Sequence, residues 1–158
     1  MSKTATEKEP RKLYGKKAEL VRRRAGFEKN IEKWIEIEEL TIKSCDAIVK
    51  KSKSPIVNAL MNAVKMDSQK HRELLKFVQQ CLDGTITLTP EELASASDLI
   101  EAHVKFERDA IVMAQKSLED SRHFVITQVL KYILEDERKH FSMVTDMNAY
   151  KSHIYPYA

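Results

Sequence analysis

One pattern of polar residues occurs twice in this sequence, and the second copy follows the first at an offset of 69 residues. Glu38 precedes His71 by 33 residues, and Glu107 precedes His140 by the same 33 residues. The segments that end at the two histidines nearly repeat as well, reading DSQKH and DERKH. A chain that repeats itself in this register is constrained to fold as two similar units, each with one glutamate and one histidine in equivalent places.

Composition favours helices throughout. The 158 residues include only three glycines and four prolines, and 32% of them are charged, which fits an all-helical protein better than a sandwich or barrel. No apolar run approaches the roughly 18 residues of a membrane span. The first residues lack the hydrophobic core of a signal peptide, so we expect a cytoplasmic protein. Two isolated cysteines form neither a zinc ribbon nor a disulfide framework, and Cys45 is interpreted as a small core residue.

Apolar residues at helical spacing predict four long helices. We expect the first over about 19–51, the second from Ser54-Pro55 to near Asp83-Gly84, the third from Thr89-Pro90, and the fourth after Ser121. Residues 85–88 alternate like a short extended link. Four such helices favour an all-α fold, a four-helix bundle of two duplicated helical hairpins over residues 25–149. A basic arm over 1–24 and a tail over 150–158 flank it.

Acidic and histidine side chains interrupt the apolar stripes near the middle of each expected helix. Glu137 and His140 lie among the apolar residues that are expected to face inward on the fourth helix. Glu38, His71 and Glu107 lie among the inward-facing residues of the first, second and third helices. Buried carboxylates without a partner cost several kcal/mol each, so these must be protonated or hold cations. Mixed carboxylate and imidazole ligands suit iron or manganese, and less specifically zinc. The sequence therefore predicts a metal site.

The arrangement resembles the ferritin-like superfamily, particularly its rubrerythrin-type and archaeal ferritin-like di-iron carboxylate domains. The resemblance covers roughly residues 25–148. Glu137-Arg138-Lys139-His140 matches the Glu-x-x-His motif of that superfamily, and Glu38 and Glu107 match its lone glutamates. It implies two iron ions per chain, with manganese or zinc as alternatives, and His71 and His140 each anchoring one ion.

The second helix departs from the motif of the superfamily, because Ser68 stands where a glutamate is expected. Asp67, adjacent to it, is a candidate substitute ligand with a shorter side chain, or is simply solvated. His103, one turn before Glu107, is a further candidate, either as a ligand or as a residue that supports one.

The resemblance implies a stand-alone rubrerythrin-like peroxide reductase or ferroxidase in iron handling and oxidative stress. The chain has no paired Cys-x-x-Cys motifs, so an external electron donor, rubredoxin-like or other, is implied. The alternative is a degenerate bundle that binds one metal or none and acts as a binding or regulatory module. A mini-ferritin with a DNA-binding tail ranks lowest.

Residues 1–24 carry nine Lys/Arg against three Glu. We interpret this basic arm as a solvated lead-in rather than a nucleic-acid contact. Aromatic residues in the tail favour a homodimer, and no membrane partner is expected.

Overall fold

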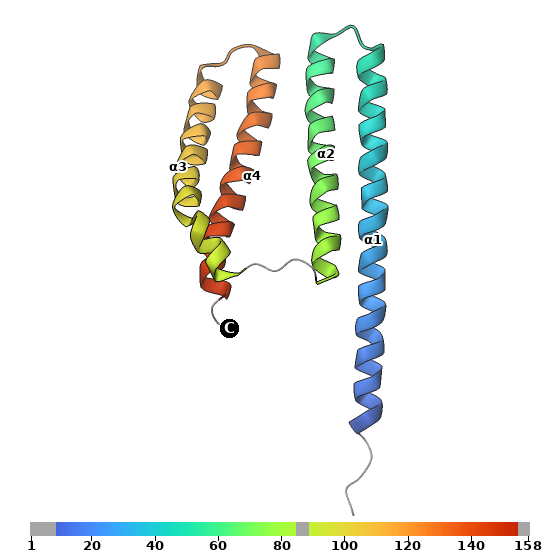
Figure 1. Cartoon of the computed structure of the whole chain (residues 1–158). Coiled ribbons are helices and arrows are strands. Elements are labelled where there is room, and N and C mark those ends of the chain that lie inside the picture. The colour runs from blue at the N-terminus through green and yellow to red at the C-terminus, as the bar shows by residue number, and fades with distance from the viewer. Residues whose placement is uncertain (1–8, 85–88, 155–158) are drawn as a thin grey trace, which may run out of the picture. The chain divides into compact units, whose positions relative to one another are not determined.

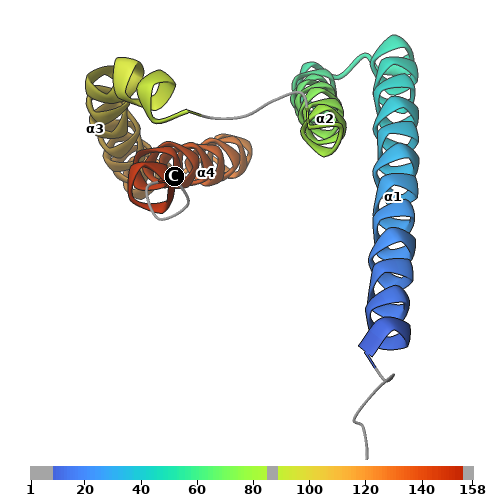
Figure 2. The same cartoon turned by 60° about the horizontal axis from the view of Figure 1, so that its bottom comes forward.

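The computed structural model describes residues 9–84 and 89–154, and these form four helices with no strand among them. The helices are α1 (Glu9–Lys51), α2 (Pro55–Leu82), α3 (Pro90–Asp120) and α4 (Phe124–Ile154) (Figure 1). α1 packs on α2, and α3 packs on α4. The second pair lies side by side in both Figure 1 and Figure 2. The predicted all-α fold class and its two helical hairpins are confirmed.

The chain divides into two compact units, residues 1–87 and residues 88–158, and each contains one hairpin. The bounds of the helices show the duplication directly. α1 ends at Lys51 and α3 at Asp120, while α2 begins at Pro55 and α4 at Phe124, and both pairs differ by the same 69 positions. The domain limits at residues 25 and 149 stay a prediction.

The two turns between helices also have equivalent contacts. In the first hairpin the Asn58 side chain donates to the backbone carbonyl of Ser52 at 3.5 Å. In the second, the hydroxyls of Ser121 and Thr127, which occupy the equivalent positions, are 2.9 Å apart. Each contact joins the turn to the first turn of the following helix, so both hairpins reverse direction in a similar way.

Helix ends follow the capping residues that the sequence indicates. The Ser54 hydroxyl accepts from the Val57 backbone N–H at 3.4 Å at the start of α2. At the start of α3 the Thr89 hydroxyl accepts from the Glu92 N–H at 3.2 Å, and the Glu92 carboxylate accepts from the Thr89 N–H at 2.9 Å. This reciprocal pair is a capping box. After α2, Gly84 has φ +71°, a left-handed conformation that glycine adopts without strain.

Two helices are longer than the sequence pattern indicates. α1 begins at Glu9 rather than near residue 19, so part of the predicted basic arm is helical. α1 extends past the end of α2 (Figure 1), where the Arg24 guanidinium donates to the Leu82 carbonyl at 2.8 Å. α4 continues to Ile154, into the range predicted as a tail. Residues 1–8, the predicted link 85–88 and residues 155–158 lie outside the described residues.

Each hairpin has a narrow apolar core between its two helices. Ile31, Cys45 and Leu75 are buried in the first, and Leu93, Ala114 and Leu134 in the second. Cys45 is only 3% exposed, which confirms its interpretation as a core residue. Glu38 lies midway between Ile31 and Cys45 at seven-residue spacing, so the fold places this carboxylate in the core row of α1.

None of the four helices is both long enough and apolar enough, over the described residues, to cross a membrane.

Candidate metal centre

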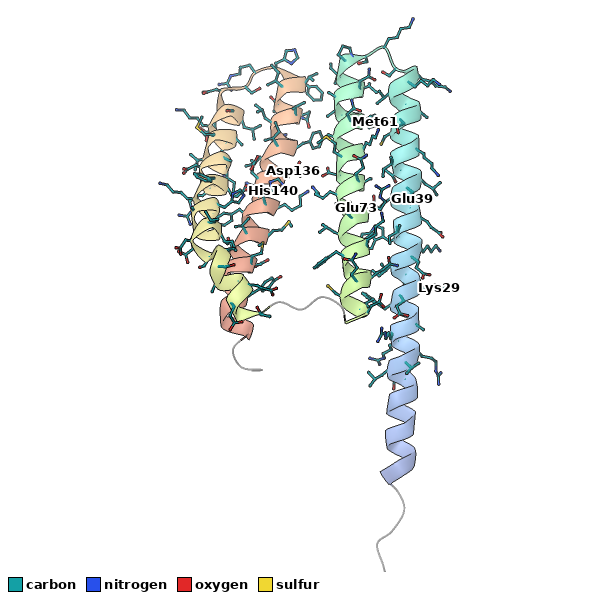
Figure 3. All side chains as sticks on the ribbon, in the orientation of Figure 1. Lys29, Glu39, Met61, Glu73, Asp136 and His140 are labelled. Atoms are coloured by element: carbon teal, nitrogen blue, oxygen red, sulfur yellow. The ribbon has the colours of Figure 1, made fainter. Side chains whose placement is uncertain are left out.

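Glu107, Glu137 and His140 come together between α3 and α4. One ligand atom from each residue lies within 4.8 Å of the other two. His140 Nδ1 is 3.9 Å from Glu107 Oε2 and 3.8 Å from Glu137 Oε2. Glu107 projects from α3, whereas Glu137 and His140 are three residues apart on α4 and therefore share a face (Figure 3 marks His140). Among the described residues this is the one His/Cys/Asp/Glu group that meets this spacing.

Burial and neighbouring charge give this cluster an unusual electrostatic balance. The pKa of Glu137 is raised, first by burial and then by a hydrogen bond and charge repulsion from Glu107, while the proximity of His140 partly opposes the increase. Among the described residues, Glu107 and Glu137 form ion pairs only with histidines. Two carboxylates in such contact must share a proton or a cation.

His103 contacts the other oxygen of Glu107. Its Nε2 lies 3.0 Å from Glu107 Oε1, across one turn of α3. The two carboxylate oxygens therefore have different neighbours, His103 at Oε1 and His140 at Oε2. His103 does not belong to the three-residue group that meets the metal-site spacing. The geometry thus separates His103 from the candidate ligands.

The equivalent positions of the first hairpin hold fewer ionisable groups. Glu38 is 7% exposed and lies 3.4 Å from His71 Nδ1 through its Oε1. The same Oε1 accepts a hydrogen bond from the Trp34 indole N–H at 2.9 Å. Ser68, at the position equivalent to Glu137, is 5% exposed. This hairpin therefore brings together one glutamate and one histidine, with a neutral N–H donor beside them.

Asp67 lies in an ion pair with Lys70, whose Nζ is 2.7 Å from its Oδ1. The second hairpin repeats this pair, with Lys139 Nζ 2.7 Å from Asp136 Oδ1. Both aspartates are about 40% exposed at the side chain (39% and 42%). The duplication of the pair indicates a surface role on each second helix, and the structure places Asp67 outside the metal-like cluster.

The predicted site residues thus fall into two sets, one in each hairpin. Sequence reasoning did not identify Trp34 as a partner of Glu38. A signal was present, because Trp34 and His103 are equivalent in the duplication and each lies four residues before the glutamate that it contacts.

Comparison of the chain with protein-family models, with curated proteins and with solved structures gave no match.

Proposed function

We propose that this chain binds a first-row transition metal ion in the α3–α4 hairpin and that its function depends on this ion. The observation that carries the proposal is the convergence of Glu107, Glu137 and His140, whose ligand atoms lie within 4.8 Å of one another. Two helices supply them, so a single packed hairpin holds the whole donor set.

The donor chemistry fits such an ion. Two carboxylates and one imidazole are ligands that iron, manganese and zinc accept. The raised pKa of Glu137, caused by burial and by Glu107, is the expected property of a carboxylate pair that has no cation between them. Three protein ligands also leave open positions on the ion, as in catalytic rather than structural metal sites.

The residues of the chain have separable roles in this proposal. Glu107 is 9% exposed and holds its charge out of water, which strengthens its attraction for a cation. His140 offers its imidazole Nδ1, which lies 3.9 Å from Glu107 Oε2. At pH values below its raised pKa, Glu137 carries a proton that must leave when an ion binds, so binding there releases a proton.

The finer proposal is a di-iron protein related to rubrerythrins that reduces peroxide or oxidises ferrous iron. Iron, when bound, supplies the electron transfer that this chemistry needs. A second ion would use Glu38 and His71, which lie 3.4 Å apart in the first hairpin. An external donor would return the electrons. The resemblance of the sequence to the ferritin-like superfamily supports this part.

Anaerobic loading with Fe²⁺, followed by addition of peroxide, tests the proposal. We expect bound iron to be oxidised by peroxide, with a new near-ultraviolet absorption band, and this oxidation to be lost in Glu107→Gln. Protein that binds neither Fe²⁺ nor Co²⁺ would refute the metal-binding proposal. Bound iron that peroxide leaves ferrous would refute only the redox part.

Buried Ser68 favours a second candidate, a metal-dependent binding module. With 5% exposure, the serine occupies a core position and supplies no carboxylate there. The first hairpin then offers an ion two ligands at most. One bound ion per chain, without peroxide chemistry, would be the signature of this function.

A further inference from the structure

Glu107 is the most constrained of the candidate ligands, because both of its carboxylate oxygens have a histidine neighbour. His103 Nε2 lies 3.0 Å from Oε1, within hydrogen-bond distance, whereas His140 Nδ1 lies 3.9 Å from Oε2. The His103 ring is itself placed by an edge-to-face contact with Phe106, with ring centroids 6.3 Å apart and planes at 89°. One oxygen therefore lies within hydrogen-bond distance of His103, and the other lies near His140.

We propose that His103 is a positioning residue that makes Glu107 a one-oxygen ligand and so selects transition metals over calcium at the α3–α4 site. The inference rests on the metal-binding function proposed above. An ionised Glu107 can only accept, so His103 donates from an Nε2–H group. The oxygen engaged in this way is withdrawn from the ion, and Oε2 alone is presented.

The selection follows from the number of oxygens that each ion requires. Calcium takes six to eight oxygen ligands and commonly uses carboxylates through both oxygens. Zinc, cobalt and iron accept fewer ligands and bind imidazole well. A carboxylate restricted to one oxygen, beside the imidazole of His140, therefore disfavours calcium more than it disfavours a transition metal.

The first hairpin also has a nitrogen-containing ring one turn before its glutamate, but the two carboxylate oxygens are used differently there. Trp34, equivalent to His103, donates its indole N–H to Glu38 Oε1 at 2.9 Å. Glu38 Oε1 is also the oxygen that lies 3.4 Å from His71 Nδ1, so in the first hairpin both neighbours contact one oxygen. In the second hairpin His103 and His140 lie at different oxygens of Glu107. Only the α3–α4 hairpin therefore has one carboxylate oxygen contacted by the residue one turn earlier while the other oxygen lies near the second histidine.

Two substitutions at His103 separate the hydrogen bond from general effects on α3. Gln carries its amide nitrogen near the position of histidine Nε2, whereas Asn carries it near Nδ1. His103→Asn should lower Co²⁺ affinity by about tenfold, the lower limit for loss of a supporting hydrogen bond to a metal ligand. His103→Gln should retain most of the affinity, measured by calorimetric titration of the full chain.

Competition between Co²⁺ and Ca²⁺ measures the metal preference of the site. This preference would not change if His103 only stabilised α3. In His103→Asn the preference for Co²⁺ over Ca²⁺ should fall, because Glu107 becomes free to use both oxygens. His123→Asn, which removes an imidazole from the turn before α4, is the matched control and should match wild type. Equal Co²⁺/Ca²⁺ preference in wild type and His103→Asn would overturn the inference.

The metal-free protein distinguishes failure of this inference from failure of the proposed function. Long-range ¹⁵N–¹H NMR of the His103 ring should show the Nε2–H tautomer, and the Glu107 carboxyl carbon should shift in His103→Asn but not in His103→Gln. An Nδ1–H tautomer would contradict the inference whether or not metal binds. Wild type that binds no Co²⁺ would refute the metal-binding function and, with it, the selection.

Discussion

In the α1–α2 hairpin Glu38 contacts one histidine and an indole N–H, whereas in the α3–α4 hairpin Glu107 faces two histidines and lies beside Glu137. The helix ends at the two turns, the turn contacts and the surface Asp–Lys pairs recur in both halves, although α1 has 43 residues and α3 has 31. The turns between the helices are therefore shared, and a difference that bears on metal binding is Ser68 in the first hairpin against Glu137 in the second. A second carboxylate at one position separates a cluster with metal-site geometry from a glutamate–histidine pair.

The largest effect is expected from Ser68→Glu, which gives the first hairpin a carboxylate at the position of Glu137. Because the position is 5% exposed, the added charge should destabilise the metal-free protein by about 3 kcal/mol. Co²⁺ should recover this loss and bind more tightly to the first hairpin. Urea unfolding with and without Co²⁺ measures both effects, and Ser68→Gln serves as the uncharged control. Destabilisation that Co²⁺ fails to relieve would show that the duplication does not extend to metal binding.

The reverse change, Glu137→Ser, gives the second hairpin the residue of the first. We expect Co²⁺ affinity at the α3–α4 site to fall by about 100-fold, the upper limit for supporting residues, because a direct ligand is lost. Glu135→Ser is the matched control, since Glu135 pairs with Arg138 at 2.6 Å on the surface. Calorimetric titration measures the affinities. Similar affinities in the two variants would exclude Glu137 as a ligand.

Changes in pH should affect the α3–α4 hairpin through Glu137. The folded-state pKa of Glu137 is raised above the ordinary value of 4.5, so the folded state binds protons more tightly than the unfolded state does. Its contribution to the stability of the metal-free protein is full below pH 4.5 and lost as the pH rises through the raised value.

Metal binding has the opposite dependence, because the ion displaces the Glu137 proton. Below the raised pKa, affinity should fall by about tenfold per pH unit for one released proton. Co²⁺ titrations at pH values on both sides of the raised pKa of Glu137 measure this slope. In metal-free Glu137→Gln the dependence of stability on pH described above should disappear. If that dependence persists in Glu137→Gln, another group is responsible for it.

The smallest effects concern the helix ends. Thr89→Ala removes one half of the capping box and should destabilise the α3–α4 hairpin by about 1 kcal/mol. Ser54→Ala removes a single 3.4 Å hydrogen bond and should cost about 0.5 kcal/mol in the first hairpin. Hydrogen exchange rates of the α2 and α3 backbone amides measure the loss of stability in each hairpin separately. A larger loss from Ser54→Ala would reverse this ranking of the caps.

Much of the fold was predictable because its signals are local. Ser54, Thr89 and Glu92 mark helix starts through contacts within one turn, and the structure has each of these caps. The early start of α1 at Glu9 was not predicted, because a basic, weakly periodic stretch carries little apolar pattern. The long α4 was missed for a related reason, since its last turns follow an irregular series of polar and aromatic residues.

The candidate site was predictable in its residues and less so in its details. The duplicated spacing identified Glu107 and His140, and the Glu-x-x-His motif identified Glu137. Which carboxylate oxygen faces which ring depends on side-chain rotamers, and residue spacing does not specify these. The different roles of His103 and Trp34 therefore required the structure.

The most direct test of the account compares Glu107→Gln with Glu38→Gln in a Co²⁺ titration of the full chain. The two glutamates are equivalent in the duplication and are both buried, so the variants are matched in chemistry and burial. We expect the tightest ion to be lost in Glu107→Gln and to remain in Glu38→Gln. Loss of the tightest ion in Glu38→Gln, or equal losses in both variants, would contradict the assignment of the metal centre to the α3–α4 hairpin.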